Sequence, residues 1–283
     1  MNEAVEKNLY PGEIPIPPDF ERHIVADYSF GAVRRHINRR TLYNLHLGIT
    51  QNIDELEARG DKAFLSLKDR VGNLLSDAVA NGVFKAACVY RFCPAQSDGD
   101  SIIVYNSGDK MFEPRTFSFP RQPGGERLCL ADFVSPASLG RMDYVALFAC
   151  TCGGGFTKEA ARLREKGKLA DSHILNVLAV TCAEALAESL HCDLRLEWGF
   201  PDAPETSDGD KLAGRYRGKR YSPGYPAFPS LEAQRDIFAL LRPEDIGLAL
   251  TENFMMEPEA SVSALALHNP KAKLFAMPRE EIK

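Results

Sequence analysis

An uninterrupted apolar run constrains the fold more than any other stretch of this sequence. Residues 144–151 read YVALFACT and lack the alternating polar positions of a strand that faces water on one side. A run of this length is typical of a strand that is buried on both faces. We therefore expect this segment in the middle of a sheet that is covered on both sides.

Shorter runs predict the rest of the sheet. Asp98 and Gly99 favour a hairpin turn between the first two of them, and Asn269 and Pro270 indicate a turn between the last two. The predicted strands are 83–92, 101–106, 116–119, 261–268 and 273–277.

Apolar residues at three- and four-residue steps predict helices. Asn81 and Gly82 end the first helix, residues 166–168 (KGK) interrupt the second, and Ser230 can cap the third. The predicted helical segments are 67–79, 157–195 and 231–241.

Strands interrupted by helices without a regular βαβ alternation predict the α+β class. We expect a single domain over residues 20–283, with a largely antiparallel twisted sheet flanked by helices. Four prolines make residues 1–19 an extended N-terminal arm.

The charge balance argues against a nucleic-acid partner. Lys and Arg total 34 against 39 Asp and Glu, a net charge of −5, whereas phosphate binding requires a basic excess. One dense basic run is interpreted either as a solvated helix face or as a docking patch for an acidic partner. Its members are Arg34, Arg35, His36, Arg39 and Arg40.

Targeting signals are not evident. No stretch approaches the roughly 18 consecutive apolar residues of a membrane span, and the acidic, proline-rich N-terminus is unlike a signal peptide. We expect a cytoplasmic protein without a membrane partner.

The seven cysteines do not predict a disulfide framework, because their number is odd and no CxxC occurs. Cys150 and Cys152, followed by three glycines, fit either small buried hydrophobes at a strand end or a thiolate metal site. The six histidines are scattered singly, and the motifs GxSxG, HExxH, GxxxxGK[ST] and GxGxxG do not occur. We predict no metal site and assign no catalytic residue.

The stretch RYSPGYPAFPS, residues 220–230, contains residue types that can bind a small ligand. Arg220 presents a planar fork of donors that matches a carboxylate, Gly224 lets a backbone approach a flat ligand, and Tyr225 offers a ring face. The prolines keep the loop stiff, so it loses little entropy on binding. The combination suits an amino acid joined to a nucleoside. The alternative is a rigid connection whose tyrosine packs into the core.

The order Arg-Tyr-Ser-Pro-Gly-Tyr-Pro resembles the RxxxGYP signature of the activation, or reactivation, domain of cobalamin-dependent methionine synthase. Further blocks are similar to that family in the same order. They are LCLADFVSP (128–136), DYVALFA (143–149), CAEALAESLH (182–191), EWGF (197–200) and LTENFMMEPEASVSALALHNP (250–270).

The resemblance implies a function. Domains of this family bind S-adenosylmethionine and cap a corrinoid, so that a cobalamin oxidised to Co(II) is methylated after one electron arrives from a flavodoxin-like donor. Positioning, rather than an acid, base or nucleophile of the domain, would carry the chemistry. Since the sequence contains no homocysteine, folate or cobalamin module and no DxHxxG corrinoid motif, we expect action in trans on a corrinoid-binding methyltransferase subunit.

The resemblance also implies site residues. Arg220 would pair with the ligand carboxylate, the backbone at Ser222 and Gly224 would approach the adenine, and Tyr225 would shape the pocket. Glu184 falls on a family glutamate near the site. By themselves, however, Glu184 and Glu188, one helical turn apart, are typical of a solvent-exposed face.

Departures from the family open an alternative. Asn38 stands where the family has an acidic ligand-binding residue, Gly214 replaces a glutamate, and Leu274 and Phe275 replace a Tyr-Tyr pair. Asn38, Leu274 and Phe275 are interpreted as part of the same ligand site, in changed form. The alternative function is a corrinoid-protein docking or chaperone module with a degenerate S-adenosylmethionine site. The resemblance implies a component of a cobalamin-dependent methionine synthase (methyltransferase) system and does not decide whether the chain is itself an enzyme.

Overall fold

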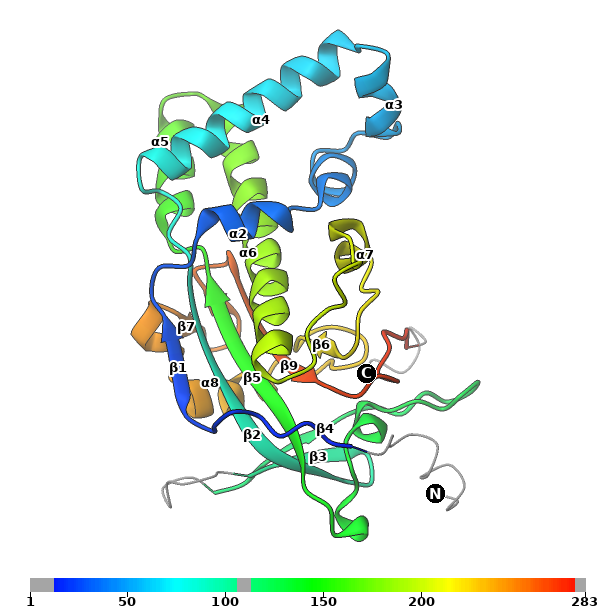
Figure 1. Ribbon diagram of the computed structural model, residues 1–283. Helices are drawn as coiled ribbons and strands as arrows, with labels where there is room; N and C mark the ends of the chain where they lie inside the picture. Colours follow the sequence, from blue (N-terminus) through cyan, green and yellow to red (C-terminus); the bar gives the residue numbers. More distant parts are fainter. Residues whose placement is uncertain (1–12, 106–112, 278–283) are drawn as a thin grey trace.

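The apolar run forms β5 (Asp143–Thr151), which lies inside a seven-stranded sheet of order β4-β3-β2-β5-β9-β6. The computed structural model describes residues 13–105 and 113–277 (Figure 1). Every described pair of neighbouring strands is antiparallel. The predicted α+β class and the central position of 144–151 are therefore confirmed.

Strand β2 (Ala87–Asp98) organises one half of the sheet. One of its edges pairs with β5 along nine residues, from Ala87 opposite Thr151 to Ala95 opposite Asp143. Its other edge is shared by β1 (Arg22–Val25) and β3 (Ser101–Val104), and β3 continues to β4 (Arg115–Ser118). On the far side of β5, β9 (Ser261–Leu267) pairs with β5 and with the short β6 (Lys219–Tyr221).

The sheet separates two hydrophobic cores, because successive side chains of a strand point to opposite faces. Phe148 and Cys150 of β5 belong to one core, and Leu147 and Ala149 belong to the other. The first core is closed by α2 (Phe30–Arg35), α4 (Lys62–Ala80), α5 (Gly155–Glu165) and α6 (Leu169–Glu197). The second is closed by α8 (Ala233–Leu241) and the 3₁₀ turn η2 (Leu130–Phe133).

The remaining elements are short. They are the π-helical turn η1 (Thr41–His46), α3 (Ile53–Ala58), the 3₁₀ turn η3 (Ala137–Leu139), α7 (Asp208–Leu212), the 3₁₀ turn η4 (Pro243–Ile246) and the two-stranded ribbon of β7 (Ala249–Leu250) and β8 (Met256–Glu257).

Most predicted elements are confirmed. The helix predicted over 67–79 begins earlier, at Lys62, because the Asp61 side chain accepts a hydrogen bond from the Phe64 amide and caps it. The helical segment after 155 is broken at Gly167, which has φ of +73°. Strand β2 begins four residues later than predicted and continues to Asp98. Asn106, the last residue of the predicted second strand, lies outside the described residues.

Two predictions are wrong. Residues 273–277 form no strand, because side chains rather than a neighbouring backbone bind two of their carbonyls: Tyr221 donates to Lys273 and Gln122 donates to Ala276. Helix α8 begins at Ala233 with Glu232 as its N-cap, so Ser230 does not cap it.

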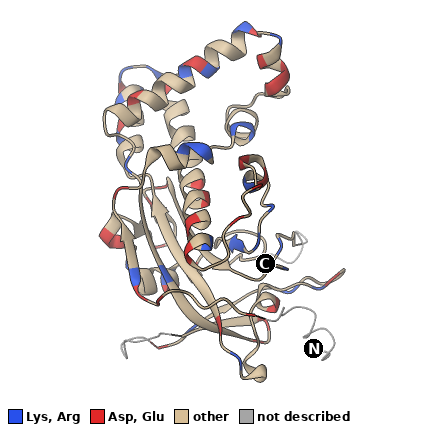
Figure 2. Cartoon of the chain, viewed as in Figure 1, with Lys and Arg blue, Asp and Glu red and all other residues tan. Residues whose placement is uncertain are grey.

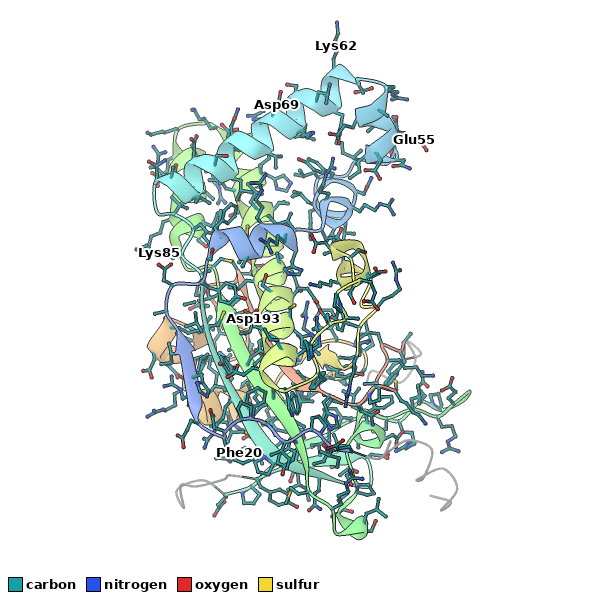
Figure 3. All side chains as sticks on the ribbon, viewed as in Figure 1. Phe20, Glu55, Lys62, Asp69, Lys85 and Asp193 are labelled. Atoms are coloured by element: carbon teal, nitrogen blue, oxygen red, sulfur yellow. The ribbon has the colours of Figure 1, made fainter. Side chains whose placement is uncertain are left out.

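The N-terminal segment passes over one face of the sheet, in front of β5 (Figure 3). Residues 13–19 contain no helix or strand, the indole N–H of Trp198 donates to the Pro15 carbonyl at 3.0 Å, and Phe20 stacks on Tyr144 of β5. Residues 1–12 of the predicted arm lie outside the described residues. The division at residue 19 stays a prediction.

The basic run is mostly engaged within the fold. Arg39 pairs with Glu57 and Arg40 pairs with Asp54, both carboxylates of α3, while His36 is buried. Figure 2 shows acidic residues on α3 and charges of both signs along α4. These pairs favour the interpretation as a solvated helix face.

Helix α6 is long and apolar enough to cross a membrane by length and composition. It is also the core helix of the sheet, and 56% of its most apolar window is buried in the protein. Core helices pass this test as readily as membrane spans do, so the helix gives weak evidence of a membrane.

Two glycine substitutions should change stability in opposite directions. A Cβ at Gly155, the first residue of α5, would lie 2.2 Å from the Val83 carbonyl oxygen, so Gly155→Ala should lower the free energy of unfolding by about 1–3 kcal/mol. A Cβ at Gly72 of α4 meets nothing within 4 Å, so Gly72→Ala should raise it by about 0.5–1 kcal/mol. Urea unfolding followed by circular dichroism measures both; equal effects would contradict the packing of α5 on residue 83.

Candidate functional site

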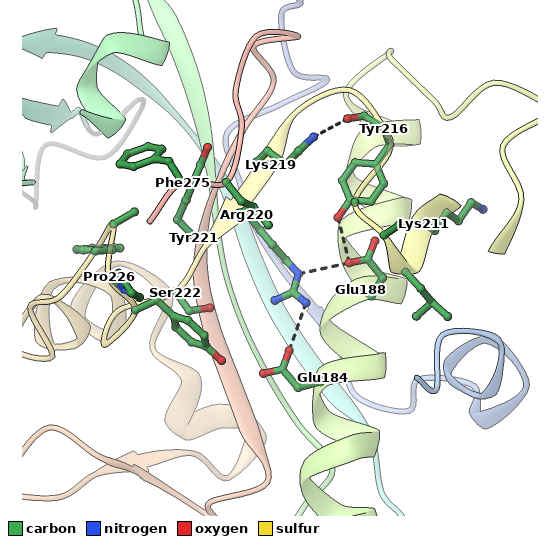
Figure 4. Close-up of a pocket in the computed structure, with 17 residues that line it drawn as sticks. Glu184, Glu188, Lys211, Tyr216, Lys219, Arg220, Tyr221, Ser222, Pro226 and Phe275 are labelled. Atoms are coloured by element: carbon green, nitrogen blue, oxygen red, sulfur yellow. Dashed lines mark hydrogen bonds and ion pairs between the residues drawn. The ribbon is translucent and has the colours of Figure 1, made fainter. Parts of the chain in front are cut away.

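The stretch 220–230 borders a cavity of about 420 Å³, which lies between α6, α7, β6 and the chain after β6 (Figure 4). Its walls are Glu184 and Glu188 of α6; Lys211, Leu212, Ala213, Gly214 and Tyr216; Lys219 to Tyr221 of β6; Ser222; Tyr225 to Phe228; and Leu274 and Phe275. We call it the first cavity.

The pairing of β6 with β9 aims Arg220 into this cavity. Tyr221 faces the core closed by α8, so its neighbour Arg220 points to the opposite face, where α6 lies. Gly218 permits the pairing: it has φ of +74°, and a Cβ there would lie 2.4 Å from the Leu267 carbonyl oxygen. The backbone thus places a guanidinium opposite two carboxylates.

Arg220 is held loosely by those two carboxylates. Its Nη2 lies 3.3 Å from Oε2 of Glu184, and its Nε lies 3.6 Å from Oε2 of Glu188. Burial opposes the charge of Arg220, but the two glutamates outweigh it and raise the pKa of the guanidinium above its ordinary value. The side chain stays 20% exposed, so an arriving carboxylate can reach its remaining donors.

Glu188 departs from the expectation of a solvent-exposed face. Its residue is only 8% exposed, and the Tyr216 hydroxyl donates to its Oε2 at 3.1 Å. Its other oxygen, Oε1, is buried and has no hydrogen-bond partner among the described residues. Glu184 is 45% exposed at its side chain, so the expectation holds better there.

Tyr216 contacts three charged residues next to the cavity, namely Glu188, Arg195 and Lys219. The guanidinium of Arg195 lies 3.8 Å from the centre of its ring, and the Lys219 ammonium lies 4.9 Å from it. Burial, followed by the charge of Glu188, raises the pKa of the Tyr216 phenol, which therefore remains a hydrogen-bond donor. Burial lowers the pKa of Lys219, whose ammonium donates to the carbonyls of Tyr216 and Gly218.

The chain after Arg220 has both buried and exposed aromatic residues. Tyr221 and Phe228 are buried in the second core, whereas Tyr225 is 58% exposed and lines the cavity. Gly224 has φ of +91°, donates to the Phe228 carbonyl, and packs so closely on Leu231 that a Cβ would lie 2.9 Å from it. Tyr221, Gly224 and Phe228 thus fit the interpretation as a rigid connection. Arg220 and Tyr225 line the cavity, as a ligand-binding loop requires.

A second cavity, of about 330 Å³, adjoins the first. Five residues line both: Glu184, Glu188, Leu212, Arg220 and Tyr225. The second cavity is completed by His36, Asn38, Thr41, Leu45, His46, Val180, Thr181 and Ala185. The ion pair between Arg220 and α6 therefore stands where the two cavities meet.

The structure places the predicted site residues in three groups. The first cavity collects six of them: Arg220, Ser222, Tyr225, Glu184, Leu274 and Phe275. Asn38 lines only the second cavity, which it shares with Glu184, Arg220 and Tyr225. Gly224 lines neither and shapes the turn instead. Ligand binding by these residues stays a prediction.

Sequence reasoning missed Tyr216, Lys219 and the buried state of Glu188. The four-residue step from Glu184 to Glu188 put both carboxylates on one helix face, which was a usable signal. That this face meets β6 depends on a pairing between residues 219–221 and 265–267, which no local pattern indicates.

No group of three or more His, Cys, Asp or Glu side chains able to hold a metal ion occurs in residues 13–105 and 113–277. Six of the seven cysteines are buried and Cys192 is half-buried; Cys88 and Cys150 stand opposite each other in the sheet. These positions fit small hydrophobes.

Comparison with known proteins identifies relatives of this chain. A family model described as "Vitamin B12 dependent methionine synthase, activation domain" matches residues 39–281. Methionine synthase of Mycobacterium tuberculosis is 31% identical over 277 residues, and that of Mycobacterium leprae is 34% identical over 284 residues. Each alignment covers 93% of this chain and 23% of the relative, so the chain spans about a quarter of the length of these proteins.

A solved structure shares the fold. The crystal structure of the MetH reactivation domain bound to AdoHcy superposes with a TM-score of 0.83 and 26% sequence identity. The match covers 98% of this chain and 88% of that one.

Removing the carboxylate of Asp202, which pairs with Arg195, should destabilise the protein. Asp202 accepts two hydrogen bonds of 2.7 Å from the buried Arg195, so Asp202→Asn leaves that charge unpaired and should lower the free energy of unfolding by about 3–5 kcal/mol. Urea unfolding measures the loss. Glu159→Gln, which breaks an exposed pair on α5, is the control and should have little effect.

The same variant should show a defined pH dependence. Burial acts to raise the pKa of Asp202, but Arg195 outweighs it and lowers the pKa. The stabilisation is therefore complete above the unfolded pKa, about 4, and is lost as the pH falls through the folded value. The stability difference between the unmutated protein and Asp202→Asn should shrink below about pH 4; a constant difference would contradict the pairing.

Proposed function

The chain belongs to the activation-domain family of vitamin B12-dependent methionine synthase, and on this premise we propose that it binds S-adenosylmethionine and supports reductive reactivation of a corrinoid carried by a partner. The proposal rests on the position of Arg220. Strand β6 directs this side chain into a cavity that aromatic residues and the two carboxylates of Glu184 and Glu188 also line. The related MetH domain was solved with AdoHcy, the product of methyl transfer from this ligand.

The cavity has the polarity that such a ligand requires. Its α6 wall carries two acids, Glu184 and Glu188, and its β6 wall carries two bases, Lys219 and Arg220. A zwitterionic amino-acid group spans such walls with its carboxylate toward β6 and its ammonium toward α6. Arg220 forms the bidentate partner of the carboxylate.

The nucleoside has apolar surface to lie against. Tyr225, Phe275 and Leu274 line the first cavity beside Ser222. Flat rings gain from stacking and from burial of their faces. The adenine therefore lies toward the chain after β6, and the sulfonium lies between it and Arg220.

The role of the domain is positioning. The partner's corrinoid supplies the cobalt, which takes one electron from a flavodoxin-like donor and then the methyl group of S-adenosylmethionine, so that S-adenosylhomocysteine leaves. Residues of this chain hold the sulfonium ligand at a fixed place, which converts the encounter of two reactants into one docking event. The partner is a corrinoid-binding methyltransferase subunit, and the domain acts on it in trans.

A second candidate function rests on Asn38. A neutral amide stands on the wall of the second cavity, and Leu274 is 68% exposed instead of enclosed. A docking or chaperone module for corrinoid proteins, with a degenerate ligand site, would tolerate both features.

Isothermal titration with S-adenosylmethionine tests the ligand. We expect saturable one-site binding, and Arg220→Ala should weaken it by about 10- to 100-fold, because a hydrogen bond to a charged group contributes about 1.5–3 kcal/mol. Arg217→Ala is the matched control: this arginine lies three residues away, stacks on Phe200 and lines neither cavity. Absence of binding by the unmutated protein at millimolar ligand would refute the proposal.

A reconstituted reaction separates the two candidate functions. The protein, a corrinoid methyltransferase subunit in the Co(II) state and a one-electron donor should convert S-adenosylmethionine to S-adenosylhomocysteine, one equivalent per corrinoid. Omission of this protein should abolish product. Capture of the corrinoid subunit that is equal with and without S-adenosylmethionine, together with no product, would instead establish the docking module.

A further inference from the structure

Residues 203–215, which include α7, form a loop whose two ends are fixed at one buried side chain (Figure 1). At the first end, Asp202 accepts two hydrogen bonds of 2.7 Å from Arg195, which is 0% exposed. At the second end, the Tyr216 ring centre lies 3.8 Å from the same guanidinium. Compact surface loops whose ends lie close together are frequently functional. We call residues 203–215 the α7 loop.

The α7 loop is held together by its own hydrogen bonds. Ser207 and Asp210 form a capping box at the start of α7. The Asp210 carboxylate also accepts a hydrogen bond of 2.7 Å from the Arg215 side chain, and the Arg215 amide donates to the Asp210 carbonyl. Before the helix, the Thr206 amide donates to the Ala203 carbonyl. These contacts allow the loop to move as one body.

Few contacts fasten the α7 loop to the rest of the protein. None of its residues, all of which the structure describes, is buried, and Leu212 belongs to neither hydrophobic core. Lys211 links the loop to α6, because its ammonium donates to the Cys192 sulfur at 3.7 Å; it also lies 3.8 Å from Asp202. A segment with few buried apolar contacts has a low free energy of local opening.

The other walls of the first cavity are better anchored. Helix α6 is buried in a core and β6 pairs with β9, while the C-terminal segment is bound through its carbonyls to Tyr221 and Gln122. The α7 loop nevertheless contributes residues 211–214 to the first cavity, and its Leu212 lines the second cavity as well. It is therefore the least anchored part of the walls around both cavities.

We propose that the α7 loop is a lid, which opens to admit the ligand and closes over it, with Leu212 covering the place where the two cavities meet. Gly214 serves as one hinge, because it has φ of +67° and a Cβ there would meet nothing within 4 Å. Closure buries Leu212, which is 37% exposed, against the ligand. The inference rests on the proposed function and adds that the ligand leaves only when the lid opens.

Cys192 reports the position of the lid. It is half-buried in contact with Lys211, whereas the other six cysteines are buried. Cys192 lines neither cavity, so a bound ligand does not cover it directly. The rate at which iodoacetamide alkylates this thiol therefore rises when the lid opens and falls when it closes.

Alkylation of the unmutated protein tests the lid. Calorimetry first gives the concentration of S-adenosylmethionine that saturates the protein. At that concentration Cys192 should be alkylated about 10-fold more slowly than in the free protein, and Cys192→Ser should remove the labelled peptide. Saturable binding with an unchanged alkylation rate would overturn the lid and leave the proposed function intact. Absence of binding would overturn both.

A variant of the loop tests whether it acts as one body. Asp210→Ala removes the capping box and the partner of Arg215, so Cys192 should be alkylated about 3- to 10-fold faster in the free protein. Glu159→Ala, which removes an exposed carboxylate paired with Arg162 on α5, is the control and should leave the rate unchanged. Thermal unfolding confirms that both variants are folded. Equal alkylation rates in the two variants would overturn the assignment of the loop as a lid.

Shortening Leu212 tests the residue that covers the ligand. In Leu212→Ala, a chase of bound radiolabelled S-adenosylmethionine should show dissociation about 10-fold faster, with the association rate unchanged. Leu169→Ala is the matched control, because Leu169 is an exposed leucine at the start of α6 that lines neither cavity. A dissociation rate that Leu212→Ala does not change would overturn the role of Leu212.

Discussion

The burial of β5 on both faces is the constraint on which the rest of the structure depends. A strand without polar positions must have neighbours on both edges and covering layers on both faces. Here β2 and β9 supply the edges, α6 covers one face, and α8 with η2 covers the other. This arrangement positions the two elements that carry the site, because β6 pairs with β9 and α6 packs on β5 and β9.

Within that framework, the cavity depends on a chain of charged and aromatic contacts. Asp202 holds the buried Arg195, Arg195 lies on the ring of Tyr216, and the Tyr216 hydroxyl holds Glu188 opposite Arg220. Each contact fixes the orientation of the next. The ligand-facing groups are thus placed by residues that do not line the cavity, such as Arg195 and Asp202.

Much of the fold could be predicted from local pattern. The run at 144–151, the periodic apolar face of α4 and the break at Gly167 are each indicated by residues close together in the sequence. The failures, at 273–277 and at Ser230, occur where side-chain hydrogen bonds from distant residues, or the exact start of a helix, decide the structure. Local propensity does not contain that information.

The sequence by itself determined the class of the sheet, its buried strand, and the residue types of a carboxylate-binding loop, because these follow from periodicity and side-chain chemistry. The family resemblance added which residues belong together. Only the tertiary structure decided that Glu188 is buried, that Asn38 lines the second cavity and not the first, and that Gly224 serves the turn. The physical reason is that burial and pairing depend on which distant segments meet, here β6 with β9 and α2 with α6.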